Sequence, residues 1–106
     1  MPSTHDYIDD KRNNNIQVYI NGKFYHRSKA KISVMDSGFL LGDGIWEGIR
    51  LYNNALIHLE DHLSRLYHGA KSISMDIPLS KKEVRLAILE TIKKNNMETD
   101  VHIRLI

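Results

Sequence analysis

The stretch that decides the fold is residues 45–73, IWEGIRLYNNALIHLEDHLSRLYHGAKSI. Its first eight residues alternate between two sides, one carrying Ile45, Glu47, Ile49 and Leu51 and the other Trp46, Gly48, Arg50 and Tyr52. A period of two predicts a β-strand. Asn53-Asn54 tolerates the left-handed conformation, so it predicts a hairpin turn into a second strand over residues 55–58.

After residue 58 the period changes to that of an α-helix. Apolar residues recur at spacings of four, three, four and three, at Leu59, Leu63, Leu66, Ala70 and Ile73. Ser80 and Glu83 form the pattern of a capping box and predict a second helix that continues through Thr91. Asn95-Asn96 is expected to close that helix in the left-handed conformation.

The residues on either side of this stretch predict further strands. Ile16, Val18 and Ile20 alternate ahead of Asn21-Gly22, the pair that a type I′ hairpin turn favours. Ile32-Ser33-Val34 suits a short strand, Asp36-Ser37-Gly38 suits a turn, and residues 101–106 alternate again. This order predicts an α+β fold, with a mainly antiparallel sheet and two helices packed on one face.

Composition and chain ends set the domain organisation. Residues 1–15 are polar and aperiodic and predict a flexible leader, whereas residues 16–106 predict one α+β domain. The last strand pattern continues to Ile106, so we expect these residues to be the front piece of a longer polypeptide. The chain has no cysteine, which excludes disulfides and thiolate chemistry, and no apolar run long enough to span a bilayer. His58 and His62 lack a third ligand, so no metal site is expected.

Two places combine residues suited to binding a ligand. Gly48 lies in the predicted strand on the side of Trp46 and Arg50, where a missing side chain allows close approach to the backbone; a glycine-hinged turn before a strand is the alternative. His102 and Arg104 project from one face of the last strand, about 6.6 Å apart, and arginine suits carboxylate or phosphate ligands. A solvated outer face of the sheet is the alternative there.

A third candidate lies on the first helix. His62 and Arg65 are at positions i and i+3, so they can flank a common point. His62 borders the apolar stripe, whereas Arg65 lies about 120° from its centre. Spacing alone therefore makes Arg65 an exposed arginine.

Taken together, these motifs resemble a known family. DSGFLLGDGIWEGIR, residues 36–50, is similar to the G-x-x-x-G-D-G…E-G-I-R segment of the class IV (fold type IV) pyridoxal-phosphate aminotransferases. These include branched-chain and D-amino-acid aminotransferases and aminodeoxychorismate lyase. Residues 62–66, HLSRL, resemble the H-x-x-R-L helix motif, residues 18–22 the opening hairpin and residues 102–104 a later strand.

The resemblance implies a role for six residues. Arg65 matches the arginine that holds the cofactor phosphate, and Trp46 an aromatic residue of the substrate pocket, with Gly48 beside it. Arg104 matches an arginine that helps to accept a distal substrate carboxylate. His102 and Leu41 replace tyrosines that are frequent in branched-chain enzymes, which argues against strict branched-chain specificity.

For the full-length protein, the resemblance implies pyridoxal 5′-phosphate-dependent transamination between a branched-chain amino acid and 2-oxoglutarate, in amino-acid biosynthesis, by a cytoplasmic homodimer. The Schiff-base lysine is expected beyond residue 106, in a C-terminal domain, so this chain supplies a phosphate clamp and a pocket wall and is inactive alone. D-amino-acid aminotransferase and aminodeoxychorismate lyase remain alternatives. A small basic RNA-binding module is the non-enzyme alternative; its interleaved acids and missing Gly-x-x-Gly clamp count against it.

Overall fold

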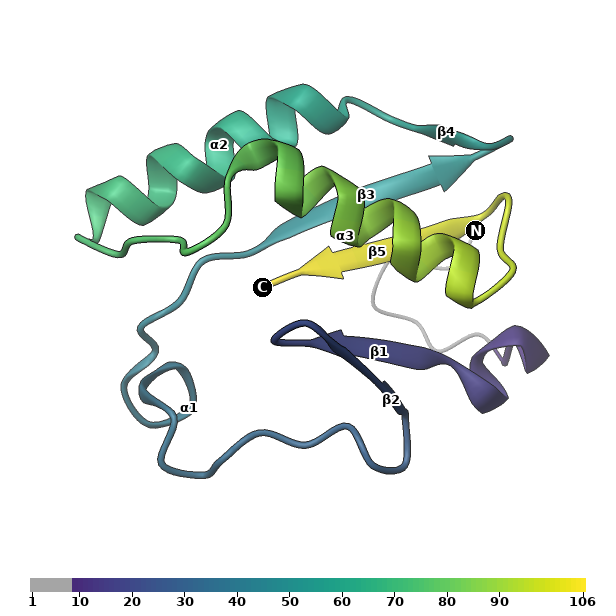
Figure 1. Ribbon diagram of the computed structural model, residues 1–106, viewed down its shortest axis with the longest axis horizontal. Helices are drawn as coiled ribbons and strands as arrows, with labels where there is room; N and C mark the ends of the chain where they lie inside the picture. Colours follow the sequence, from purple (N-terminus) through teal and green to yellow (C-terminus); the bar gives the residue numbers. More distant parts are fainter. Residues whose placement is uncertain (1–8) are drawn as a thin grey trace. The chain divides into compact units, whose positions relative to one another are not determined.

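The computed structural model describes residues 9–106, in two compact units whose boundary falls between Ala30 and Lys31. The first unit contains a 3-10 helix (Lys11–Asn15) and the hairpin of strands β1 (Gln17–Ile20) and β2 (Lys23–His26), drawn in purple and blue in Figure 1. Of the expected leader, residues 1–8 lie outside the described residues, and the 3-10 helix falls in the remainder.

The hairpin of the first unit is confirmed. Asn21 and Gly22 both have positive φ, 50° and 88°, as a type I′ turn requires. The two strands are antiparallel, and Tyr19 meets Phe24 edge to face with ring centroids 5.4 Å apart. The Asp10 carboxylate caps the preceding 3-10 helix by accepting a hydrogen bond from the Arg12 backbone N–H.

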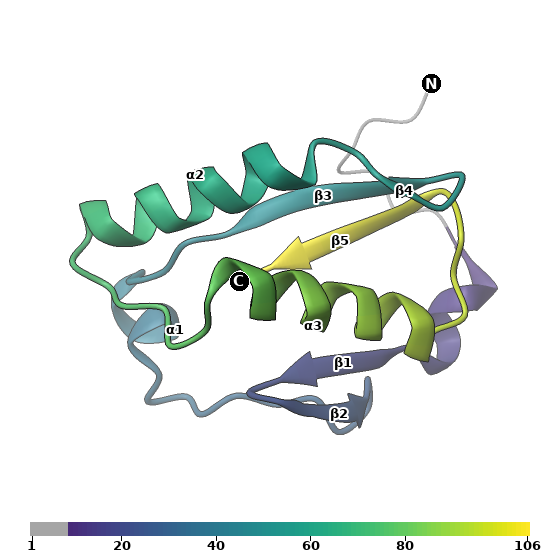
Figure 2. The ribbon, with the colours of Figure 1, turned by 45° about the horizontal axis from the view of Figure 1, so that its top comes forward.

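The second unit, Lys31–Ile106, is an α+β layer, as expected. It contains α1 (Ser37–Leu41), β3 (Glu47–Tyr52), β4 (Ala55–Leu56), α2 (Leu59–Ser72), α3 (Lys81–Lys94) and β5 (Val101–Leu105). The strands form an antiparallel sheet in the order β4-β3-β5. Helices α2 and α3 lie on one face of this sheet, as Figure 2 shows.

The core of this unit lies between the helices and the central strand. Ile49 of β3 and Leu63 of α2 are completely buried, and they cluster with Val84 and Ile88 of α3. Because side chains alternate along a strand, β3 turns Glu47, Ile49 and Leu51 toward the helices. Its other side chains therefore point to the opposite face of the sheet.

The predicted ends of α3 are largely confirmed. Ser80 and Glu83 form a reciprocal capping box, with backbone-to-side-chain distances of 3.0 and 3.1 Å. At the other end Asn96 is left-handed, with φ of 51°, but Asn95 has φ of −96°. The pair thus closes the helix through one left-handed residue, Asn96, which is enough to end it.

The segment before β3 differs from expectation. Residues 32–34 form no strand. Ile32 and Val34, which would share one side of it, are 64% and 69% exposed, so neither side chain packs against a core. The predicted turn at residues 36–38 instead begins α1. Asp36 accepts a hydrogen bond from the Gly38 N–H at 2.8 Å, and Gly42 ends the helix with φ of 72°. Within residues 9–106, no helix has the length and apolar character needed to cross a membrane.

Candidate functional site

The two faces of the β4-β3-β5 sheet carry different sets of polar side chains. In the register of β3 and β5, Glu47 lies opposite Leu105, Gly48 opposite Arg104 and Arg50 opposite His102. Glu47 faces helix α2, whereas Gly48, Arg50, His102 and Arg104 belong to the outer face. Neighbouring residues of β3 thus belong to two separate groups of side chains, one on each face of the sheet.

On the inner face, Glu47, His62 and Arg65 form a hydrogen-bonded group that we call the Glu47 cluster. The Arg65 Nε lies 3.0 Å from both carboxylate oxygens of Glu47, and Arg65 Nη2 lies 2.8 Å from Oε1. His62 Nδ1 lies 2.7 Å from the same Oε1. Since a carboxylate only accepts, the His62 Nδ1 carries the proton that it donates. His62 and Arg65 do flank a common point, as their spacing predicts, and that point is Glu47.

Hydrogen bonding within the Glu47 cluster favours the charged forms of Glu47 and Arg65. The Glu47 side chain is only 7% exposed. Hydrogen bonding from Arg65 lowers the pKa of Glu47; burial opposes this shift, and hydrogen bonding from His62 adds to it. The hydrogen bonds that Arg65 donates to the Glu47 carboxylate in turn raise the pKa of Arg65. The result is an ionised carboxylate below a permanently charged guanidinium.

Arg65 itself reaches the surface. Its side chain is 72% exposed, which agrees with the position expected from the helical period. Glu47 accepts from its Nε and Nη2, and none of residues 9–106 forms a hydrogen bond with its Nη1. An exposed arginine with one edge held and the other open has the donors that a phosphate group requires.

On the outer face, Trp46 and Arg104 lie together. The Arg104 guanidinium carbon is 4.7 Å from the centroid of the Trp46 ring, a cation–π contact, and Trp46 is 58% exposed. This pair presents an apolar ring and a cationic head side by side. Such a surface suits a ligand that has both an apolar part and a carboxylate.

The backbone at Gly48 is covered by a side chain of the neighbouring strand. A β-carbon at Gly48 would lie 2.7 Å from Cε1 and 3.1 Å from Nε2 of His102. The space that the missing side chain leaves is therefore taken by the His102 imidazole. The structure thus places the two candidates Gly48 and His102 in contact. The group that lies close to the Gly48 backbone is the His102 imidazole.

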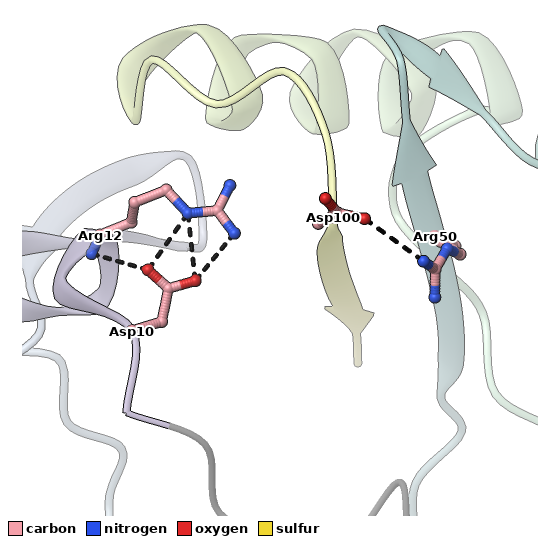
Figure 3. A network of polar contacts seen from close by, with 4 residues as sticks. All are labelled: Asp10, Arg12, Arg50 and Asp100. Atoms are coloured by element: carbon pink, nitrogen blue, oxygen red, sulfur yellow. Dashed lines mark hydrogen bonds and ion pairs between the residues drawn. The ribbon is translucent and has the colours of Figure 1, made fainter. Parts of the chain in front are cut away.

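Further along the same face, Arg50 and Asp100 form an ion pair at 3.5 Å, with both side chains more than 60% exposed (Figure 3). Arg50 also lies over the Tyr52 ring, 5.7 Å from its centroid. Arg50 and His102 help to line an open hollow. The other pair in Figure 3, Asp10 and Arg12, belongs to the first unit, where it caps the 3-10 helix.

The remaining candidate, Leu41, lies at the end of α1 and is 74% exposed. Its neighbours Phe39 and Leu40 are exposed as well. The structure thus places Leu41 on an apolar surface rather than in the core. Within residues 9–106, no group of three His, Cys, Asp or Glu side chains is arranged to hold a metal ion.

Sequence reasoning missed Glu47 as a functional candidate. The signal was present, since Glu47 shares its side of β3 with Ile49 and Leu51, which are both buried. A carboxylate on the apolar side of a strand needs a cationic partner, because an unpaired buried charge is very unfavourable. The period of α2 then offers His62 and Arg65 as the basic residues in reach.

This arrangement can be compared with known proteins. A model of the family described as amino-transferase class IV matches residues 44–106, which include β3, α2 and β5. The chain belongs to the class IV aminotransferase family.

Individual relatives agree with that assignment. The chain is 47% identical over 91 residues to a putative branched-chain-amino-acid aminotransferase of Methanocaldococcus jannaschii, covering 86% of this chain and 31% of the relative. It is 34% identical over 84 residues to a D-alanine aminotransferase of Listeria monocytogenes, covering 79% of this chain and 29% of that protein. The chain therefore spans about a third of the length of these relatives.

The fold agrees with solved structures of the same family. The branched-chain aminotransferase of Thermoproteus uzoniensis with norvaline superposes with a TM-score of 0.78 at 33% identity, and the match covers 85% of this chain and 32% of that chain. A second branched-chain amino acid aminotransferase, complexed with N-(5′-phosphopyridoxyl)-L-glutamate, superposes with a TM-score of 0.77 at 32% identity. That match covers 85% of this chain and 31% of the other.

Proposed function

We propose that this chain is the N-terminal part of a longer pyridoxal 5′-phosphate-dependent aminotransferase that transfers an amino group between a branched-chain amino acid and 2-oxoglutarate. The name of the M. jannaschii relative and its greater length support this proposal. The phosphopyridoxyl compound bound to one of the solved aminotransferases supports the choice of cofactor. The observation that carries it is the arrangement of Arg65, which is exposed, charged and held in one orientation.

In this proposal Arg65 clamps the cofactor phosphate. Its Nη1, which no residue of the described part 9–106 engages, would donate charge-assisted hydrogen bonds to phosphate oxygens, while its Nε would stay on Glu47. Glu47 and Arg65 together carry almost no net charge, so the clamp acts by directed donors rather than by bulk attraction. Further phosphate donors then have to come from other parts of the protein.

When bound, the cofactor supplies the electron sink that allows bonds at the amino-acid Cα to break. None of the nine lysines of this chain falls within the motifs that resemble the family. As the resemblance to the family implies, we propose that the Schiff-base lysine lies in a second domain, beyond residue 106. The chain alone is expected to bind and orient but not to turn over substrate.

The outer face of the sheet forms one wall of the proposed substrate pocket, through Trp46, Gly48, His102 and Arg104. The Trp46 ring would contact an aliphatic side chain, and the Arg104 guanidinium would bind the distal carboxylate of 2-oxoglutarate. His102 over Gly48 sets the depth of this wall, because its imidazole fills the space above the backbone. A tyrosine here would add a ring of different reach and polarity.

Leu41 has its proposed role at a subunit interface. With Phe39 and Leu40 it forms an exposed apolar surface on α1, of the kind that association buries. We propose a homodimer in which Leu41 reaches the pocket of the partner subunit, in a cytoplasmic enzyme of amino-acid biosynthesis. Its expected substrates are small molecules, an amino acid and a keto acid.

A second candidate function is transamination of D-amino acids. The similarity to D-alanine aminotransferases favours it, at 34% identity. L-leucine and D-alanine, each supplied with 2-oxoglutarate, distinguish the two in an assay of the full-length protein. Faster turnover of L-leucine is expected, and turnover of D-alanine alone would replace the first candidate.

The clamp is tested by the substitution Arg65→Ala in the full-length protein, with Arg85→Ala as the control. Arg85 also donates to a glutamate, with its Nε 2.9 Å from Glu60 Oε1, but lies outside the Glu47 cluster. We expect Arg65→Ala to weaken the affinity for pyridoxal 5′-phosphate by about tenfold or more and to leave that for pyridoxal, which has no phosphate, unchanged. Equal affinities of wild type and Arg65→Ala for the phosphorylated cofactor would overturn the clamp.

A further inference from the structure

We infer that Glu47 is a positioning residue that sets the direction in which Arg65 presents its free N–H groups. This inference rests on the proposed function of Arg65 as a phosphate clamp. Glu47 itself would not touch the cofactor, because it engages the opposite edge of the guanidinium.

The contacts between the two side chains fix an orientation rather than only a distance. Arg65 Nε is 3.0 Å from each carboxylate oxygen, and Nη2 adds a contact of 2.8 Å to Oε1. A planar guanidinium held at two nitrogens cannot rotate about its terminal bonds without breaking a hydrogen bond. The direction of Nη1 is thereby determined by the position of the Glu47 carboxylate.

The carboxylate is itself held firmly. Glu47 is the first residue of β3, and its backbone is paired with Leu105 of β5. Its side chain is 7% exposed, and Oε1 also accepts a hydrogen bond from His62 Nδ1 at 2.7 Å. The sheet therefore fixes the position of Glu47. The Glu47 carboxylate in turn holds the Arg65 side chain, which is 72% exposed.

The exposed glutamate–arginine pair of α2 and α3 provides a contrast. Glu60 and Arg85 also form a salt bridge, but the Glu60 side chain is 66% exposed. A pair with an exposed carboxylate fixes its arginine weakly, since water competes for the charges. Ordering a long, mobile side chain when a ligand binds opposes binding, and in the Glu47 cluster that ordering has already happened.

The experiment compares Glu47→Gln and Glu60→Gln in the full-length protein, by titration with pyridoxal 5′-phosphate and with pyridoxal. Glutamine keeps the shape of the side chain but offers one acceptor oxygen in place of two. We expect Glu47→Gln to weaken binding of the phosphorylated cofactor about tenfold and to leave pyridoxal affinity unchanged. Glu60→Gln is expected to change neither affinity.

Further variants distinguish failure of the positioning role from failure of the clamp. Glu47→Asp keeps the charge but shortens the reach, so we expect it to weaken phosphate-dependent binding as well; it carries the test if Glu47→Gln does not fold. Combined with Arg65→Ala, neither Glu47 substitution should weaken binding further. If Arg65→Ala weakens binding but both Glu47 variants bind as the wild type does, the positioning role is refuted and the clamp stands. If Arg65→Ala has no effect, the clamp itself fails.

Discussion

The two faces of the β4-β3-β5 sheet differ in how deeply their charged side chains are buried and how closely these are paired. On the inner face, the Glu47 carboxylate is buried and its contacts with His62 and Arg65 are all 3.0 Å or shorter. On the outer face, Arg50 and Asp100 are mostly exposed and 3.5 Å apart. A buried charge persists only when it is fully paired, whereas exposed pairs contribute little. The inner face therefore holds the Arg65 side chain in one orientation, whereas the outer-face cations make exposed contacts, Arg50 with Asp100 and Arg104 with Trp46.

The largest expected difference between the faces is in packing. Ile49 is completely buried on the inner side of β3, whereas Tyr52 is 47% exposed on the outer side. We expect Ile49→Ala to lower the free energy of unfolding by about 2–5 kcal/mol and Tyr52→Ala to change it by no more than about 0.5 kcal/mol. Urea denaturation followed by circular dichroism measures both, and similar losses in the two variants would contradict the contrast.

The next effect depends on pH and concerns the Glu47 cluster. Because Arg65 lowers the pKa of Glu47 in the folded state, the carboxylate stabilises the fold above its unfolded-state pKa of about 4.3. That stabilisation is lost as the pH falls through the lower, folded-state pKa. We expect Glu47→Gln to lower the free energy of unfolding by about 1 kcal/mol at pH 7, with the difference from wild type shrinking in acid. A difference that stays constant between pH 7 and pH 3 would show that the charge is not involved.

A smaller effect tests the contact between Gly48 and His102. Glycine weakens a strand by about 0.5–1 kcal/mol relative to alanine, but a β-carbon at Gly48 meets the imidazole at 2.7 Å. Gly48→Ala is therefore expected to bring no gain in stability while His102 is present, and a gain of about 0.5 kcal/mol in the His102→Ala background. A double-mutant cycle with both substitutions measures the coupling. Equal effects in the two backgrounds would mean that the ring does not occupy this space.

The smallest effect concerns Trp46, the only tryptophan in the sequence. Removing the cation above its ring by Arg104→Gln is expected to change stability by less than about 0.5 kcal/mol, but to shift the tryptophan emission. Arg50→Gln is the matched control, because Arg50 lies over Tyr52 instead. An emission shift of the same size in both variants would argue against the contact between Arg104 and Trp46.

Elements with local signals could be predicted from the sequence. The turns at Asn21-Gly22 and Asn53-Asn54, the apolar stripe of α2 and the capping box of α3 each depend on a few neighbouring residues. The conformation of residues 32–34 could not, because Ile32 and Val34 have no buried face to pack against. Alternation without burial is a weak signal for a strand.

For the candidate site, too, some features could be predicted from the sequence and others could not. The faces of Arg65, Trp46, Gly48 and Arg104 followed from the period of their elements. The identity of their contacts did not, since Glu47 meets Arg65 across 18 residues of sequence. The filling of the space at Gly48 depends on a register between β3 and β5 that the sequence does not specify locally.

The register of β3 has a consequence for the gene that encodes it. Because consecutive residues of the strand serve opposite faces, losing one codon between Glu47 and Tyr52 would exchange those faces downstream of the lesion. An arginine would then enter the apolar interior while an isoleucine turned to water. Length variation among descendants of this gene should accordingly be absent from the strand and accumulate in the connections that precede and follow it.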